Sequence, residues 1–251
     1  MKRIESPKNA RVKQWKKLLA KKGREEAGCF LLEGFHLVEE AVKSDAPLVE
    51  LIVDERTAIP PGWDVSGVPV VIVTEAVMKA ISSTETPQGI AAVCRQQPHE
   101  LSGVKTALLI DAVQDPGNLG AMIRTADAAG IDAVVLGEGC ADLYNPKVVR
   151  ATQGSLFHLP VVKGDVAEWI TRLKGQGIPV YGTALENAVD YRSLPRLSAF
   201  ALVVGNEGSG VRRELLEMTT ENVYIPIYGQ AESLNVAVAT GILLYSLQAE
   251  R

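Results

Sequence analysis

Three polar stretches in the second half of the chain hold side chains that could do chemistry. They are "DPGNLGAMIRTADAAG" (115–130), "LVVGNEGSGV" (202–211) and "IPIYGQAESLNVAVA" (225–239). Their candidate reactive or positioning groups are Asn118, Arg124, Glu207, Ser233 and Asn235. Amides, hydroxyls, a carboxylate and a guanidinium can orient a substrate, handle a proton or stabilise a developing charge. The stretches are therefore candidates for a functional site.

The Gly-rich stretch raises the question of a phosphate site. A strand that opens into a glycine turn and then a helix is the usual layout of such a site. Here Val211 follows Gly210 where a Walker loop needs a lysine, and "DPGNLGAMIR" does not match the dinucleotide fingerprint. Glu207 would also repel a phosphate. A neutral or cationic ligand fits the loop better.

The elements that must position these groups follow from the hydrophobic pattern after residue 106. Apolar runs of strand length alternate with helical patterns, and the predicted strands are "ALLIDAV", "DAVVLG", "LPVV", "PVYGTA", "FALVVG" and "VYIPI". Such continuous apolar strands indicate a mostly parallel sheet with helices on both faces. The three polar stretches each follow a strand, so we expect them at the carboxyl edge of one sheet.

The first part of the chain reads as a smaller α/β domain. Strand and helix patterns alternate from about residue 28 to 95, and the polar stretch 96–106 has little apolar content. We therefore predict a basic N-terminal helix and small α/β domain over residues 1–95, a linker over 96–106 and a second domain over 107–251.

Positive charge is concentrated at the N-terminus. Residues 1–24 hold ten Lys or Arg against one acid, a formal charge of +9 in a chain whose net charge is −4. This pattern favours a polyanionic partner such as RNA. The alternative is a solvated amphipathic helix whose apolar residues Val12, Trp15, Leu18 and Leu19 pack inward.

Other features exclude several classes of protein. No apolar run is long enough to span a membrane, and the basic N-terminus lacks the apolar core of a signal peptide, so we expect a cytoplasmic location. Three scattered cysteines (Cys29, Cys94, Cys140) and three scattered histidines (His36, His99, His158) predict neither a disulfide framework nor a metal centre.

With these residues in view, the chain resembles the SpoU/TrmH-type RNA ribose methyltransferases of the SPOUT superfamily. That family's three motifs are matched in order and spacing by "NLGAMIRTADAAG" (118–130), "LVVGNEGSGV" (202–211) and "IPIYGQAESLNVAVATGILLY" (225–245). "FLLEG" (30–34) and "TETPQGIAAV" (84–93) are similar to the small substrate-binding domain that many members carry. The likeness thus extends over nearly the whole chain.

The resemblance implies a function and a fold. It implies transfer of a methyl group from S-adenosyl-L-methionine to a ribose 2′-hydroxyl in structured RNA, with 23S rRNA favoured over tRNA. It also implies a homodimer and a deep trefoil knot in the second domain, which the hydrophobic pattern alone would not disclose. An inactive RNA-binding or ribosome-assembly factor of the same fold is the alternative. The missing lysine disfavours an ordinary nucleotide-dependent enzyme.

The resemblance also assigns the site residues. The cofactor would be held by main-chain atoms at or beside Thr183, Ala184, Gly205, Asn206, Ile225, Pro226 and Leu234. At Gly205 a side chain would block close approach of the ligand to the backbone. The catalytic set would be Asn118, Arg124, Glu207, Ser233 and Asn235.

Individual roles for the catalytic set differ. Arg124 stays protonated, so we expect it to orient the ribose and a phosphate and to stabilise the developing alkoxide; a salt bridge with Asp127 is the alternative. Asn118 would contact the acceptor or Arg124, and its position also suits a helix N-cap.

Glu207 would face a basic group or the substrate, unless it is merely an exposed loop carboxylate. Ser233 suits the N-cap of the last helix and supports the site, and Asn235 serves catalysis or geometry. That helix, "NVAVATGILLYSL", is apolar on nearly all sides, so it must be buried in the core or against a second subunit.

Overall fold

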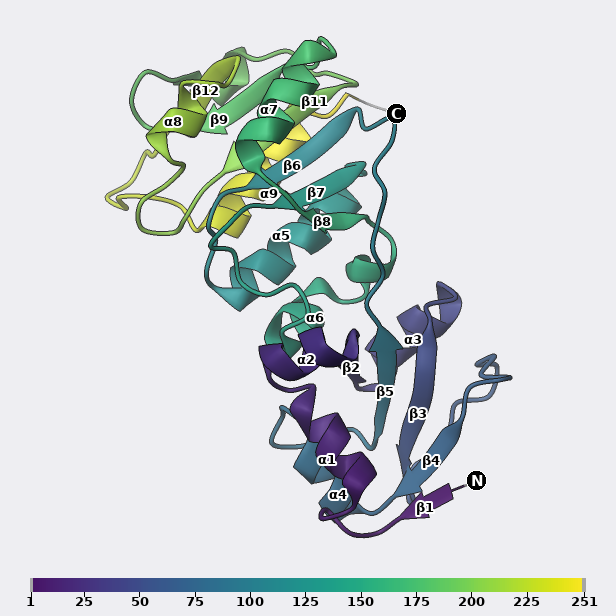
Figure 1. The fold of residues 1–251 in the computed structure, drawn as a ribbon. Coiled ribbons are helices and arrows are strands. Elements are labelled where there is room, and N and C mark those ends of the chain that lie inside the picture. The colour runs from purple at the N-terminus through teal and green to yellow at the C-terminus, as the bar shows by residue number, and fades with distance from the viewer. Residues whose placement is uncertain (1, 250–251) are drawn as a thin grey trace. The chain divides into compact units, whose positions relative to one another are not determined.

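The computed structural model describes residues 2–249, which fold as two compact units (Figure 1). The first unit comprises the chain up to Gln97 together with Asp142–His158. The second comprises Pro98–Ala141 and the chain from Leu159 on. Among the described residues, no helix combines the length and the apolar character that crossing a bilayer requires.

The first unit is built on a five-stranded sheet. Its elements are β1 (Lys2–Ile4), α1 (Ala10–Lys17), α2 (Lys21–Ala27), β2 (Cys29–Glu33), α3 (Phe35–Lys43), β3 (Leu48–Asp54), β4 (Val70–Val73), α4 (Glu75–Ile81), β5 (Ile90–Arg95), α6 (Pro146–Thr152) and η1 (Ser155–Phe157). The strand order is β1-β4-β3-β5-β2. The strands β1, β4 and β3 are parallel, while β5 runs antiparallel to both of its neighbours.

The predicted N-terminal helix is wrong in its extent, because the segment divides into β1, α1 and α2. Asn9 caps α1 by accepting a hydrogen bond from the Arg11 N–H, and Gly28 ends α2 in the left-handed conformation with φ of 59°. The inward packing that the alternative interpretation required is observed: Val12, Trp15 and Leu18 lie in the core, and Leu19 packs against it partly buried. Hence the segment is an integral part of the first unit.

Residues 142–158 pack with the first unit, although they lie inside the range 107–251 that was predicted as the second domain. Val148 and Val149 of α6 are buried, and α6 packs against β2. The Tyr144 ring lies 4.7 Å from that of Phe30, measured between centroids. Asp142 accepts hydrogen bonds from Arg24. These contacts attach residues 142–158 to the first unit. The hydrophobic pattern of this segment resembles that of its neighbours in the sequence, so it could not reveal the attachment.

The second unit is built on a seven-stranded sheet. Its elements are β6 (Thr106–Ile110), α5 (Pro116–Ala128), β7 (Ala133–Leu136), β8 (Val161–Lys163), α7 (Val166–Gly175), β9 (Val180–Thr183), β10 (Val189–Asp190), η2 (Tyr191–Ser193), β11 (Phe200–Val204), α8 (Arg213–Leu216), β12 (Glu221–Tyr224) and α9 (Val236–Leu247). The strand order is β10-β12-β9-β11-β6-β7-β8 and every pair is parallel, which confirms the predicted sheet.

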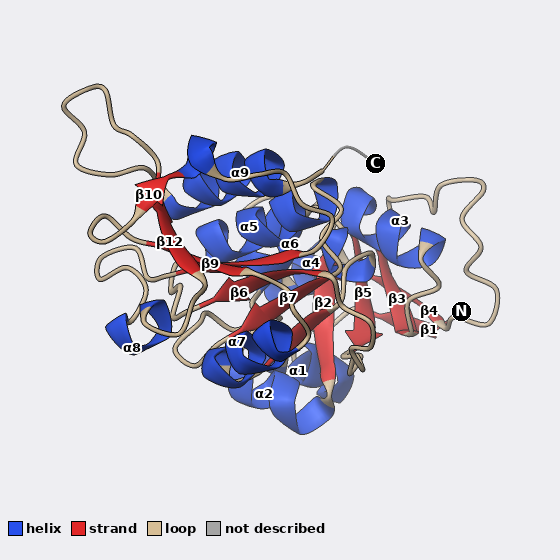
Figure 2. Cartoon of the chain, turned by 90° about the horizontal axis from the view of Figure 1, so that it is seen from above, coloured by secondary structure: helices blue, strands red, loops and turns tan. Residues whose placement is uncertain are grey.

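Helices cover both faces of this sheet, as predicted. The helices α7 and α8 lie on one face, and α5 and α9 lie on the other (Figure 2). Because side chains alternate along a strand, Ala107 and Leu109 pack with α7 residues such as Ile170, while Leu108 and Ile110 point to the opposite face. Full burial on both faces explains the uninterrupted apolar strands.

The register brings the ends of four strands to one edge. Ile110 lies opposite Val204, Val203 opposite Gly182, and Thr183 opposite Val223. The predicted strand "VYIPI" is displaced, because β12 ends at Tyr224. Pro226 has no N–H to donate to a ladder, which explains an irregular chain beyond that point.

Candidate active site

The three polar stretches converge at the carboxyl edge of the large sheet. The first follows β6 and opens α5, the second follows β11, and the third runs from the end of β12 to the start of α9. In the sheet order β12-β9-β11-β6, the third stretch starts at the end of β12 and passes along this edge towards the end of β6. The predicted meeting of the stretches at one sheet edge is therefore observed.

A chain of hydrogen bonds ties the three stretches together. The Asn235 side-chain amide donates to Asn118 Oδ1 over 2.9 Å, and the Asn118 amide donates to Glu207 Oε1 over 3.2 Å. Each residue comes from a different stretch. The arrangement fixes the side-chain amide orientation of Asn118, because one of its ends donates and the other accepts.

Glu207 anchors the end of this chain. Its two carboxylate oxygens also accept the backbone N–H groups of Asp115 at 3.0 Å and Gln114 at 3.2 Å. Partial burial alone would raise the pKa of this carboxyl. Hydrogen bonds from its own backbone N–H, from Asn118 and from the two N–H groups outweigh that effect and hold the pKa below its ordinary value. Glu207 is therefore an ionised acceptor rather than an idle surface carboxylate.

Two predicted helix caps are wrong. Asp115, and not Asn118, caps α5, because its carboxylate accepts the Asn118 N–H at 2.8 Å and Pro116 opens the helix. Asn235, and not Ser233, caps α9 by accepting the N–H groups of Ala237 and Val238. Asn235 thus combines a capping oxygen with an amide that reaches Asn118. Ser233 is exposed and lies outside this network.

The Gly-rich loop closes on itself. Asn206 and Gly210 exchange backbone hydrogen bonds of 3.0 and 2.9 Å, and Asn206 Oδ1 accepts the N–H groups of Gly208 and Ser209. A Cβ at Gly205 would lie 2.2 Å from the backbone of Gly210. Gly205 is therefore required by the loop itself, whereas the sequence had suggested only the approach of a ligand.

A second connection at this edge was not predicted. Asp111, fully buried at the end of β6, accepts both the backbone N–H and the side-chain Nε of Arg212, at 3.0 and 2.9 Å. Asn206 also donates its amide to the carbonyl of Ala112, whose φ is 56°. These bonds fix the Gly-rich loop against the first stretch. The signal in the sequence was an acidic residue directly after an apolar strand.

Main-chain groups suited to a ligand are available here. Within residues 2–249, the backbone N–H and C=O groups of Gly205, Ile225 and Leu234 make no hydrogen bond, although Gly205 is buried. Thr183 lies at the end of β9 next to Ala184, whose N–H donates to Val223. Unpaired main-chain groups of this kind can bind a polar ligand.

Arg124 stands apart from this network. It is exposed on α5 and, within the described part of the chain, its side chain makes no hydrogen bond or ion pair. The alternative salt bridge with Asp127 is therefore not formed. A guanidinium without an internal partner is available to an anionic group of a substrate.

Comparison with known proteins identifies this arrangement. A model of the SpoU rRNA methylase family matches residues 105–245, which hold all three polar stretches, and a model of the MRM3-like substrate binding domain matches residues 9–92. The chain belongs to the SpoU rRNA methylase family. The predicted family and fold class are thus confirmed.

Relatives resemble this SpoU methylase over its full length. It is 54% identical over 248 residues to the 23S rRNA (guanosine(2553)-2′-O)-methyltransferase RlmP of Bacillus subtilis (strain 168), with 99% of this chain and 100% of the relative covered. The AdoMet-bound rRNA methyltransferase from Sinorhizobium meliloti has a TM-score of 0.87 and 34% identity, covering 98% and 97% of the two chains.

A third relative has the same architecture. AviRb from Streptomyces viridochromogenes, solved in complex with AdoMet, has a TM-score of 0.84 and 29% identity, with 96% of this chain and 97% of that chain covered. Two relatives with similar structures were therefore solved with the methyl donor AdoMet bound.

Proposed function

We propose that this SpoU methylase transfers a methyl group from S-adenosyl-L-methionine to a ribose 2′-hydroxyl of 23S rRNA. The observation that carries the proposal is the chain of hydrogen bonds from Asn235 through Asn118 to Glu207 at the edge that holds unpaired main-chain groups. The full-length similarity to the Bacillus subtilis enzyme supports the choice of RNA and of the 2′-oxygen.

Main-chain atoms hold the cofactor in this proposal. Gly205, Ile225 and Leu234 supply the unpaired groups, and Thr183, Ala184, Asn206 and Pro226 shape the surrounding strand ends. The cofactor supplies an electrophilic methyl group on a positively charged sulfur. The absence of a cationic phosphate clamp from the Gly-rich loop agrees with a ligand of this charge.

The polar network prepares the acceptor side. Methyl transfer requires the 2′-hydroxyl to approach in line and to lose its proton as the new bond forms. Arg124 orients the ribose and its phosphate and stabilises the charge that develops on the oxygen. Asn118, Asn235 and Glu207 keep the start of α5 in place. Ser233 is assigned a supporting role by its position in the segment that leads into α9.

The lysines of α1 contact the RNA backbone. Several bases of the N-terminal segment are engaged internally: Arg24 is buried against Asp142, and Arg11 pairs with Glu50. Lys13, Lys16 and Lys17 are exposed and make no ion pair within the described residues. They lie on one helix face by their spacing of three and four. A variant with Lys→Gln at all three positions therefore tests this RNA contact. It is a better test than deletion of the N-terminal segment, because that segment belongs to the core of the first unit.

The exposed face of α9 forms a homodimer interface in this proposal. Val238 and Tyr245 are 52% and 57% exposed on a helix that otherwise packs against α5 and β11. An apolar surface of this kind is unfavourable in water and marks an interaction site. A cytoplasmic location and the trefoil knot stay predictions.

Transfer of tritium from labelled S-adenosyl-L-methionine to unmodified 23S rRNA tests the activity. We expect labelled rRNA, no label in tRNA, and one ribose methylation when the product is mapped. Arg124→Ala is expected to lower kcat at least about 100-fold while cofactor binding stays within twofold. Arg213→Ala, which removes an exposed guanidinium on α8, is the matched control.

The alternative functions give different results. A protein that binds the cofactor and RNA but labels no RNA would support an inactive assembly factor. Loss of cofactor binding together with activity in Arg124→Ala would make Arg124 a structural residue.

A further inference from the structure

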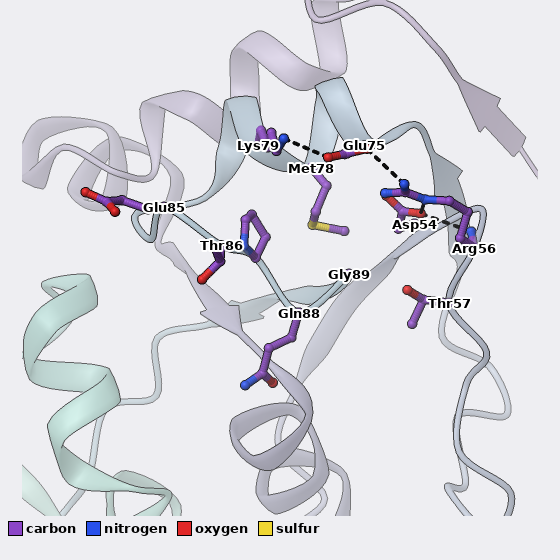
Figure 3. Close-up of a pocket in the computed structure, with 11 residues that line it drawn as sticks. Asp54, Arg56, Thr57, Glu75, Met78, Lys79, Glu85, Thr86, Gln88 and Gly89 are labelled. Atoms are coloured by element: carbon purple, nitrogen blue, oxygen red, sulfur yellow. Dashed lines mark hydrogen bonds and ion pairs between the residues drawn. The ribbon is translucent and has the colours of Figure 1, made fainter.

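The first unit contains two adjoining cavities, which are lined by a segment that is not part of the candidate active site. In the segment "TETPQG" (84–89), residues 85–89 line a cavity of about 540 Å³ (Figure 3). Thr84 and three of the other residues line a second cavity of about 200 Å³. The two cavities share four lining residues: Met78, Thr86, Pro87 and Gln88. Glu33 and Gly34 of the "FLLEG" motif line the smaller one. Both N-terminal motifs therefore converge on these cavities.

Four of the charged groups that line the larger cavity are paired with one another. Arg56 donates to Asp54 over 3.0 Å and pairs with Glu75 over 2.9 Å, and Lys79 pairs with Glu75 over 2.7 Å (Figure 3). Hydrogen bonding to Arg56 holds the pKa of the buried Asp54 below its ordinary value. The Arg56 guanidinium is thus held in place by two carboxylates. Its planar face remains a surface on which an aromatic ring can stack.

Neutral polar groups complete the lining. The hydroxyls of Thr57 and Thr86 and the amide nitrogen of Gln88 make no hydrogen bond within residues 2–249, while Gln88 Oε1 accepts the Phe35 N–H at 2.9 Å. Gly89, with φ of 83°, allows Thr57 to approach, because a Cβ there would lie 2.2 Å from the Thr57 hydroxyl. The buried Met78 adds an apolar surface.

We propose that the larger cavity receives one unpaired base of the substrate RNA. A base is planar and uncharged, so it can stack on Arg56 and Met78 while its edge meets the two hydroxyls and the amide. Three carboxylates line the cavity, from Asp54, Glu75 and Glu85, against two cations, and they disfavour a phosphate inside it. The phosphates stay outside, on the lysines of α1, which packs against α4. The inference rests on the proposed RNA substrate.

Filling the cavity tests this assignment. Thr86 is exposed at the cavity and has no partner to lose, so Thr86→Trp blocks the space without breaking a bond. Ala27→Trp places the same side chain at an exposed position of α2 outside both cavities and is the matched control. Glu85→Trp is a second blocking variant, which carries the test should Thr86→Trp fail to unfold cooperatively.

The readouts separate RNA recognition from chemistry. With unmodified 23S rRNA, Thr86→Trp is expected to raise KM and Kd for RNA about tenfold while kcat and cofactor binding stay within twofold. 2-Aminopurine, placed in turn at each unpaired position of a 23S rRNA fragment around the mapped methylation site, should change fluorescence on binding at one position in the wild type and in Ala27→Trp. That change should disappear in Thr86→Trp.

Each outcome bears on the proposal. Unchanged RNA affinity in both blocking variants, or the lack of any responsive 2-aminopurine position, would overturn the proposal. If the wild type captures a protein partner that Thr86→Trp does not capture, and RNA binding is unchanged, the cavity would belong to that partner instead. If the wild type transfers no methyl group but Thr86→Trp still weakens RNA binding, the proposed activity fails and the base cavity stands.

Discussion

Glu207 shows how one side chain joins separate stretches of sequence. Its carboxylate accepts hydrogen bonds from Asn118 and from two backbone N–H groups at the start of the first polar stretch. Glutamine has nearly the same shape but replaces one oxygen by a donor, which would face N–H groups. We expect Glu207→Gln to lower the free energy of unfolding by about 1 kcal/mol at neutral pH and to lower kcat.

The effect of Glu207→Gln should depend on pH. The folded-state pKa of Glu207 lies below the ordinary value of 4.5, so its carboxylate adds stability above that value and loses it as the pH falls through the folded-state pKa. Urea unfolding between pH 7 and pH 3 should show a constant difference from wild type above about pH 5, which shrinks at lower pH. Glu214→Gln, an exposed carboxylate on α8, is the control. A difference that grows on acidification would contradict the assigned hydrogen bonds.

Residue types were predictable from the sequence, but their exact partners were not. The sequence singled out Asn118, Glu207 and Asn235, which the structure joins by hydrogen bonds. The capping roles of Asp115 and Asn235 were missed, because several polar residues precede each helix and only the chain path selects one. The bond from Asp111 to Arg212 spans 101 positions, so no local pattern could reveal it.

At the scale of an element, the Gly-rich loop depends on close contact between its own two ends. A Cβ at Gly205 would lie 2.2 Å from Gly210, whereas at Gly208 the nearest atom within reach is Asn206 Oδ1 at 3.5 Å. We expect Gly205→Ala to open the loop, to cost about 1–3 kcal/mol of stability and to weaken S-adenosyl-L-methionine binding at least about tenfold.

Gly208→Ala is the matched control for this loop. It adds the same methyl group without a close contact and should leave cofactor affinity within about twofold of the wild type. Calorimetric titration with S-adenosyl-L-methionine and urea unfolding measure the two effects. Equal cofactor affinity in both variants would mean that loop closure does not shape the cofactor site.

Elements with strong periodicity were predicted well, and those set by tertiary contacts were not. The helices α5, α7 and α9 and the apolar strands of the large sheet follow from their patterns. The short β1 was missed because its pairing partner β4 lies nearly 70 residues away in the sequence. The two-residue β10 was missed because it is defined by its pairing with β12 and carries too few residues for a pattern.

At the scale of the whole molecule, a buried ion pair fixes the N-terminal segment to residues far along the chain. Arg24 is 3% exposed and donates to Asp142 and to the carbonyls of Leu18 and Leu19. The sequence counted Arg24 among the bases available to RNA, which is wrong because its guanidinium is fully engaged. Removal of one buried partner leaves the other charge uncompensated.

Arg24→Ala is therefore expected to destabilise the first unit by about 3–5 kcal/mol. Lys22→Ala, which removes an exposed base from the same helix, should change stability by less than about 0.5 kcal/mol. Urea unfolding of the two variants measures the difference. Similar small effects would mean that Asp142 finds other donors when Arg24 is removed.

In the proposed homodimer, assembly of the two chains would depend on the exposed apolar face of α9. Val238 is 52% exposed there, and a glutamate at this position would place an unpaired charge in the proposed dimer interface. We expect Val238→Glu to raise the dimer dissociation constant by about 100-fold or more, as measured by sedimentation equilibrium. Leu185→Glu is the control, since Leu185 is 77% exposed in the loop between β9 and β10 and takes no part in that face. A wild-type protein that sediments as a monomer, or a Val238→Glu variant that remains dimeric, would remove α9 from the interface.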